Sequence, residues 1–104
     1  MNRNTKKTLH LNLRRKWFDM ILSGEKKEEY REFVPYWMTR FANIRNASEP
    51  TTTITFSHGY SKNRDQFVVR LKTIWIRKGR PEWGADVGKD YFVLEIGERV
   101  EKTD

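Results

Sequence analysis

The sequence predicts an α+β domain, namely a small β-barrel of about five strands with two short helices near its N-terminus. Short segments with alternating or β-branched residues recur along the chain, and two apolar stripes with helical spacing lie in its first half. Turns that contain glycine or proline separate these segments. A closed or nearly closed barrel would leave few exposed edges on so small a sheet.

The chain has 104 residues, which is enough for one domain, and no linker or repeat divides it. We expect residues 1–7, which are polar and basic, to form a flexible tail and residues 8–104 to form the domain. The first element of that domain is a half-buried strand, because Leu9, Leu11 and Leu13 alternate with polar residues.

Two short helices are expected next. Residues 15–23 place apolar side chains, including Trp17, at helical spacing, and Gly24 stands where a helix commonly ends in a left-handed residue. A second helix is expected over residues 35–44, because it opens on a proline, which suits a first helical turn. Trp37 lies on its apolar stripe, so both tryptophans are expected to pack in the core.

Three further strands are expected in the second half of the chain, which is rich in β-branched and aromatic residues. They span residues 51–57, 66–77 and 91–96. The segments between them contain turn-forming residues and are expected to be loops, at residues 46–50, 58–63 and 78–89. Together with the extended segment discussed below, this gives five strands.

The composition excludes several kinds of chemistry. The chain has no cysteine, which excludes a disulfide scaffold, a thiolate nucleophile and a cysteine zinc site. His10 and His58 do not form a metal-binding spacing, so we expect neither a metal nor a cofactor. No apolar segment is long enough for a signal peptide or a membrane span, and we therefore expect a cytoplasmic protein that does not bind membranes.

The net charge of +7 is unevenly distributed. Residues 1–16 and residues 61–80 each carry a net charge of +6. If folding brings the two blocks onto one face, that face would attract a polyanion such as RNA. The alternative is an ordinary solvated basic surface. The residues that we expect to contact a nucleic-acid backbone are Arg14, Arg15, Lys16, Lys62, Arg64, Arg77 and Lys78.

Nearly every residue between Gly24 and Phe33 is charged. One interpretation is a solvated edge strand whose charges oppose aggregation. The other follows from geometry, since Glu29 and Arg31 project to the same face of an extended segment and Lys26 can approach them after the turn. A lysine, a carboxylate and an arginine that converge in a cleft can hold a phosphate, or can position a proton donor and acceptor.

These residues resemble the signature of the ASCH domain family, which is part of the PUA-like superfamily. The family pattern is Gly-x-Lys-x-x-Glu-x-Arg directly after a short amphipathic helix, and the chain is similar to it at Gly24, Lys26, Glu29 and Arg31. Further segments are similar to family members, so that the resemblance covers about residues 8–98. These segments are residues 11–23, 58–61, 81–85 and 91–94.

The resemblance implies a PUA-like β-barrel with a cleft lined by the signature residues, and it implies binding of RNA or a nucleoside-like ligand. Some family members are enzymes: certain small relatives resemble amidohydrolases that deacylate acetylated cytidine, and another resembles a ribonuclease. In the amidohydrolase type a threonine follows three residues after the signature lysine, whereas this chain has Glu29 there. We therefore expect RNA or nucleoside recognition, with a small hydrolase acting on a modified nucleoside or on RNA as the alternative.

If the chain is a hydrolase, its catalytic candidates are Lys26 and Glu29, with Glu82 as a more distant carboxylate. Tyr60 and Trp83 lie in expected loops, where their rings could stack on a base or fold back onto the barrel. The expected ligand-binding residues are Lys26, Glu29, Arg31, Tyr60, Ser61 and Trp83. A third hypothesis is an adaptor whose charged cluster binds a protein. Oligomeric state and ligand identity stay open.

Overall fold

The computed structural model describes residues 8–45 and 52–100. The elements in chain order are β1 (Thr8–Asn12), α1 (Arg15–Leu22), β2 (Glu28–Arg31), α2 (Pro35–Arg45), β3 (Thr53–His58), β4 (Asp65–Lys78), the short 3-10 helix η1 (Pro81–Trp83) and β5 (Asp90–Arg99). Five strands and two α-helices confirm the predicted α+β class. The tail and the first loop that the sequence predicts, at residues 1–7 and 46–50, lie outside the described residues.

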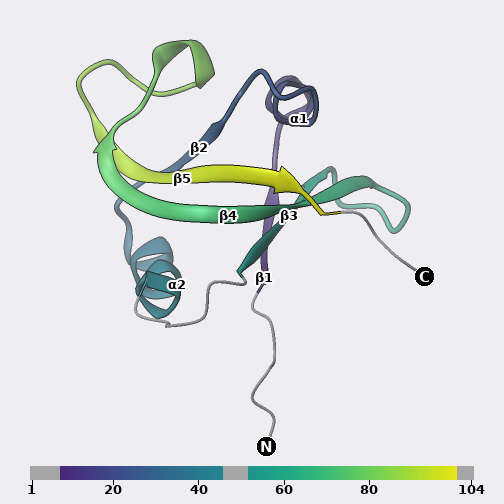
Figure 1. Cartoon of the computed structure of the whole chain (residues 1–104), viewed down its shortest axis with the longest axis horizontal. Helices are drawn as coiled ribbons and strands as arrows, with labels where there is room; N and C mark the ends of the chain where they lie inside the picture. The colour runs from purple at the N-terminus through teal and green to yellow at the C-terminus, as the bar shows by residue number, and fades with distance from the viewer. Residues whose placement is uncertain (1–7, 46–51, 101–104) are drawn as a thin grey trace, which may run out of the picture.

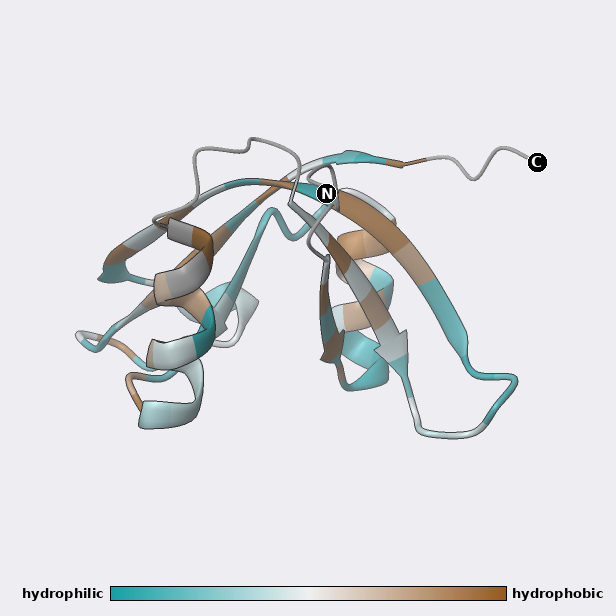
Figure 2. Ribbon diagram, turned by 90° about the horizontal axis from the view of Figure 1, so that it is seen from below, coloured by the Kyte–Doolittle hydropathy of each residue, from teal (hydrophilic) through white to brown (hydrophobic). Residues whose placement is uncertain are grey.

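All five strands form one curled sheet in the order β1-β3-β4-β5-β2 (Figure 1). β1 and β3 are parallel, and the other neighbours are antiparallel. The long strands β4 and β5 arch across the molecule (Figure 2), and their pairing shifts register twice between Val69 and Thr73. Such irregularities bend a sheet. The result is a half-barrel whose two edges, β1 and β2, do not pair with each other within the described residues.

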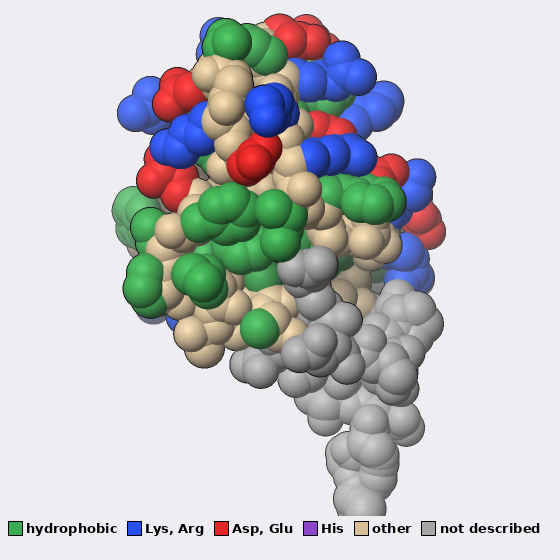
Figure 3. All heavy atoms as spheres, turned by 90° about the vertical axis from the view of Figure 1, so that its left-hand side faces the viewer, with side chains coloured by type: hydrophobic (Ala, Val, Ile, Leu, Met, Phe, Trp, Pro, Cys, Tyr) green, Lys and Arg blue, Asp and Glu red, His purple; other side chains and the backbone are tan. Residues whose placement is uncertain are grey.

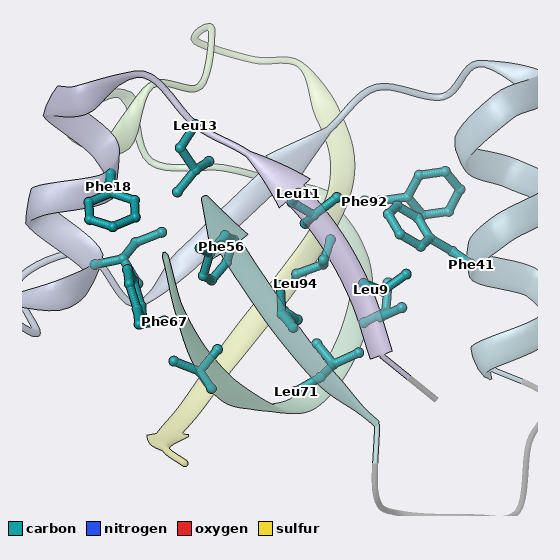
Figure 4. Close-up of a cluster of buried hydrophobic side chains, with 14 residues drawn as sticks. Leu9, Leu11, Leu13, Phe18, Phe41, Phe56, Phe67, Leu71, Phe92 and Leu94 are labelled. Atoms are coloured by element: carbon teal, nitrogen blue, oxygen red, sulfur yellow. The ribbon is translucent and has the colours of Figure 1, made fainter. Parts of the chain in front are cut away.

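The core fills the concave side of this half-barrel, beneath the arch. At one end the Phe18 ring of α1 packs edge-on against Phe67 with centroids 4.9 Å apart, and at the other end Phe41 of α2 packs against Phe92 at 5.1 Å (Figure 4). Aliphatic side chains fill the space between them, including the predicted alternating leucines of the first strand. Burying each large apolar side chain contributes about 1.5–3 kcal/mol, so the core fixes both helices against the sheet.

The structure differs from the sequence prediction mainly in the second half of the chain. β5 is longer than predicted, because both of its ends continue to pair with the long strand β4, at Lys78 with Asp90 and at Val69 with Arg99. The predicted loop over residues 78–89 contains η1, whose proline stands in its first turn. Among the described residues, no helix is both long and apolar enough to cross a membrane.

Candidate functional site

The turn after α1 directs Lys26 into the protein. Ser23 continues the helix by donating its N–H to the Asp19 carbonyl, and Gly24 then takes a positive φ of 89°. This is the left-handed conformation that glycine adopts without a steric cost. The backbone N–H of Lys26 returns to the Met20 carbonyl at 2.9 Å. The lysine side chain therefore starts beside the end of α1 and is only 2% exposed.

Glu29 and Arg31 reach Lys26 from the neighbouring strand β2. Their register partners on β5 are Leu94 and Phe92, both of which belong to the core, so the two side chains face the concave side. Lys26 Nζ lies 3.1 Å from Glu29 Oε1, and Arg31 Nη2 donates to Glu29 Oε2 at 2.8 Å. The three side chains converge as their spacing predicted. We refer to Lys26, Glu29 and Arg31 as the buried triad.

Lys26 makes further contacts with the loop after β4 and with two aromatic rings. Its Nζ donates to the Trp83 carbonyl at 2.5 Å, and it lies 4.4 Å from the Trp17 ring centroid and 5.3 Å from that of Tyr30. Burial lowers the pKa of Lys26 below its ordinary 10.5, and the attraction of the Glu29 carboxylate opposes this shift. The ammonium group is thus held by one carboxylate, one carbonyl and aromatic faces.

Arg31 closes the seam between the two edge strands of the half-barrel. Its Nη2 also donates to the carbonyl of Asn12 on β1 at 3.3 Å, and its guanidinium carbon lies 5.1 Å from the ring centroid of Trp37. The Nε–H of the same guanidinium is buried and has no hydrogen-bond partner among the described residues. Buried N–H groups are almost always hydrogen-bonded, so this donor is suited to an acceptor atom that a ligand brings.

The charges of the buried triad do not cancel. Two cations share one carboxylate, and Glu29 is itself only 6% exposed. A buried group with a formal charge of +1 lies in surroundings where electrostatic attraction is stronger than in water. The arrangement favours a ligand with negative charge, since the oxygens of phosphate and carboxylate groups are the acceptors that guanidinium groups recognise best.

Of the other predicted ligand-binding residues, Trp83 contacts the triad, whereas Tyr60 and Ser61 lie in the turn after β3. Trp83 contributes its backbone carbonyl to Lys26, while its half-buried ring lies under the guanidinium of Arg80 at 5.1 Å. Tyr60 is 86% exposed in the turn after β3, and Ser61 beside it is also exposed. This turn is attached to the seam, because Asn12 Nδ2 donates to the Gly59 carbonyl at 2.6 Å.

The predicted distant carboxylate does not join the triad. The Glu82 side chain is 60% exposed, and its carboxylate lies 3.5 Å from Arg80 in a surface ion pair. The reason is local: η1 starts at Pro81, and its short turn leaves the following side chain in solvent. Of the predicted catalytic residues, only Lys26 and Glu29 are brought together.

The predicted backbone-binding residues separate into two groups. Arg15 contacts Asp65 at 2.8 Å, which brings the start of α1 beside the β3–β4 turn. Among the described residues, no ion pair involves the basic side chains on this rim, namely Arg14, Lys16, Lys62 and Arg64. Arg77 and Lys78 lie at the other end of β4 and pair with Glu28 and Asp90. The second basic block is therefore divided between the two ends of a 14-residue strand.

Two residues of the site, Asn12 and Trp37, were not among those predicted from the sequence. Asn12 joins the edge of β1 both to Arg31 and to the β3–β4 turn, and Trp37 lies beneath the Arg31 guanidinium. In the sequence, Asn12 is a polar residue near the end of the first predicted strand, two residues before the basic triplet at positions 14–16. This position was the one indication that it could belong to the site. Trp37 was expected to pack in the core. It does stack on Phe41 at 5.3 Å, but it is only partly buried.

A hollow lies between α1, β4 and β5. It has a volume of about 160 Å³, and its apolar walls include Ile21, Phe67 and Ile96. Lys27 and Arg99 stand at its polar side. Its lining also includes Lys26 of the buried triad, but neither Glu29 nor Arg31. The hollow therefore adjoins the triad on the side away from Arg31, and it provides a second location at which a small ligand can be tested.

The fold and the site together define a small α+β half-barrel domain with a buried Lys-Glu-Arg triad at its seam. No family model matches the chain, and no curated protein matches its sequence.

A substitution of Gly84 tests the support of the triad. Gly84 follows the carbonyl that holds Lys26, has a φ of 105°, and an added Cβ would lie 3.0 Å from the Trp17 ring. We expect Gly84→Ala to lower the unfolding free energy by about 1–3 kcal/mol in urea titrations. Gly88→Ala is the control, because Gly88 also has a positive φ but open space around it. If both variants lose the same unfolding free energy, the contact between residue 84 and the Trp17 ring does not contribute to the loss.

The lowered pKa of Lys26 predicts a pH dependence. Between the folded-state pKa of Lys26 and the ordinary value of 10.5, the unfolded chain binds one more proton at this position. The unfolding free energy should therefore rise with pH in that window, and below it the cost of the buried cation is fully present. Comparing wild type with Lys26→Met isolates this contribution. If the unfolding free energies of the two proteins change with pH in the same way, Lys26 does not have a lowered pKa in the folded protein.

Proposed function

We propose that this chain is an ASCH-type domain with a PUA-like barrel, and that it binds RNA or a nucleoside-like ligand at the seam between β1 and β2. The observation that carries the proposal is the buried triad, in which two cations share one carboxylate while the Arg31 Nε–H has no partner within residues 8–45 and 52–100. The resemblance of the same residues to the ASCH signature also motivates it.

Each member of the triad has a role that follows from its contacts. Arg31 offers its free Nε–H to a phosphate or base carbonyl oxygen. Both oxygens of Glu29 already bind the two cations, so Glu29 holds these groups in position rather than contacting the ligand. Lys26 supplies positive charge behind Arg31, where burial strengthens its attraction for an anion.

The rim around α1 and the β3–β4 turn is suited to the rest of an RNA strand. Arg14, Lys16, Lys62 and Arg64 are exposed there, and none of them has an acidic partner among the described residues. The exposed ring of Tyr60 lies within the same turn. Cations contact phosphates without reading the sequence, while exposed rings stack on bases.

A salt titration tests the proposal. A labelled single-stranded RNA should bind at low salt, and its affinity should fall as salt rises from about 50 to 200 mM. Replacing both Lys62 and Arg64 with alanine should reduce the slope of log K against log salt by about 1.4, that is about 0.7 for each lost contact. Absence of binding at low salt, or binding that ignores salt, would reject RNA as the ligand.

A hydrolase is the second candidate, and a specific observation favours it. Burial lowers the pKa of Lys26, and the Glu29 carboxylate lies 3.1 Å from its Nζ, so the pair could exchange a proton with a substrate. Turnover of acetylated cytidine and of single-stranded RNA should be measured for wild type and Lys26→Ala. Equal rates in the two proteins would exclude a catalytic role for this lysine.

A further inference from the structure

Two aromatic rings in contact, each with a guanidinium group over it, lead from the buried triad to the surface of α2. Arg31 lies over Trp37 at 5.1 Å, Trp37 meets Tyr36 edge-on at 4.7 Å, and Arg40 lies over Tyr36 at 4.2 Å. We refer to Arg31, Trp37, Tyr36 and Arg40 as the α2 ladder. Its inner end belongs to the proposed binding site, and its outer end has no role in the core.

The outer end of the ladder lies on an exposed apolar surface. Tyr36 is 56% exposed, and large apolar side chains around it, Phe33 and Met38 among them, are also exposed. Figure 3 shows hydrophobic side chains gathered on the face that includes α2, below a region of charged side chains. Exposed apolar surface that joins a binding site commonly extends that site.

The charges on this surface favour a polyanion over a protein partner of mixed charge. No aspartate or glutamate occurs from Phe33 to Arg45, whereas the segment contains two arginines. Arg40 makes no ion pair within the part of the chain that the structure describes. Rings that alternate with cations are the means by which proteins hold single-stranded nucleic acid, because every base has a face that can stack.

We propose that Tyr36 and Arg40 form a stacking subsite for the nucleotide next to the one that Arg31 holds. The base would stack on the exposed face of Tyr36, and its phosphate would contact Arg40. The ligand of the seam is then a single-stranded RNA of at least two nucleotides rather than an isolated nucleoside. This inference rests on the proposed function and specifies its substrate class.

A length series of ligands tests the subsite. The affinities of cytidine monophosphate and of a single-stranded RNA tetranucleotide are measured for wild type, Tyr36→Leu and Tyr36→Phe. Wild type should bind the tetranucleotide more tightly than the monophosphate. Tyr36→Leu should weaken tetranucleotide binding by about 5- to 150-fold, since stacking on one ring contributes roughly 1–3 kcal/mol per base. Tyr36→Phe keeps the ring and should retain the tight binding.

Trp75→Leu is the matched control. Trp75 is also an exposed ring with a guanidinium over it, that of Arg77 at 4.9 Å, but it pairs with Val93 on the other face of the sheet. Replacing Trp75 should leave the difference in affinity between the tetranucleotide and the monophosphate unchanged. Thermal unfolding of each variant checks that the half-barrel is intact.

The outcomes separate this inference from the proposed function. If the monophosphate binds, but the tetranucleotide binds more tightly by the same factor in Tyr36→Leu as in wild type, the stacking subsite is wrong and the seam site stands. If neither ligand binds at low salt, both proposals fail. If Tyr36→Leu instead abolishes a self-association that sedimentation detects in wild type, the surface is a protein interface and the subsite is also wrong.

Discussion

Replacing Glu29 with glutamine is expected to lower the unfolding free energy by about 3–5 kcal/mol, because it leaves the buried Lys26 ammonium and the partly buried Arg31 guanidinium without their shared counter-charge. The shape of the side chain is nearly unchanged, so lost packing contributes little. Most single substitutions cost about 1 kcal/mol, which makes this a large effect for a domain of this size. Urea or thermal unfolding measures it directly.

Two further variants separate charge from other causes. Glu82→Gln breaks an exposed ion pair with Arg80 and should change stability by less than about 1 kcal/mol. The double variant Lys26→Met with Glu29→Gln removes one of the two cations and should recover part of the lost stability. If Glu29→Gln costs no more than Glu82→Gln, the triad does not act as a buried ionic unit.

Replacing Arg31 with alanine is expected to weaken binding of cytidine monophosphate by about 10- to 100-fold, since a hydrogen bond to a charged group contributes roughly 1.5–3 kcal/mol. The variant should stay folded, because Lys26 and Glu29 then form a balanced pair. Isothermal titration or fluorescence measures the affinity. Arg31→Lys keeps the charge but loses the planar donor groups and the Nε–H, and it should recover only part of the binding.

Arg70→Ala is the control for this loss. Arg70 is an exposed arginine of β4 that pairs with Glu98, and it contacts none of the triad. Removing it should leave the affinity within about twofold, in keeping with the small energies of surface ion pairs. An Arg31→Ala protein that binds as tightly as Arg70→Ala would remove the triad from the ligand site.

Much of the fold follows from local patterns. The alternation in residues 9–13, the apolar stripe of residues 15–23 and the proline at position 35 predicted β1 and both helices, because side-chain burial in each case repeats with the period of the element. The spacing of Lys26, Glu29 and Arg31 likewise predicted their convergence, since a turn and a short strand determine it. These features depend on residues close together in sequence.

The remaining features depend on contacts between distant segments. The parallel pairing of β1 with β3, and the open seam that Arg31 bridges to Asn12, follow from how the sheet curls. No local pattern indicates that Arg77 pairs with Glu28 or that Glu82 stays in solvent. The charge blocks of the sequence therefore suggested one continuous basic face, whereas part of that charge is neutralised by acids far along the chain.

The most direct test of the account observes the Arg31 Nε–H itself. In a ¹⁵N-labelled protein, the arginine Nε–H resonances are followed while cytidine monophosphate is added. If the seam binds the ligand, the Arg31 resonance should shift most, together with the indole of Trp37 and the amide of Asn12, and the shifts should saturate. Shifts confined to the hollow between α1, β4 and β5, at Phe67 and Ile96, would contradict binding at the seam, as would an Arg31 signal that does not move.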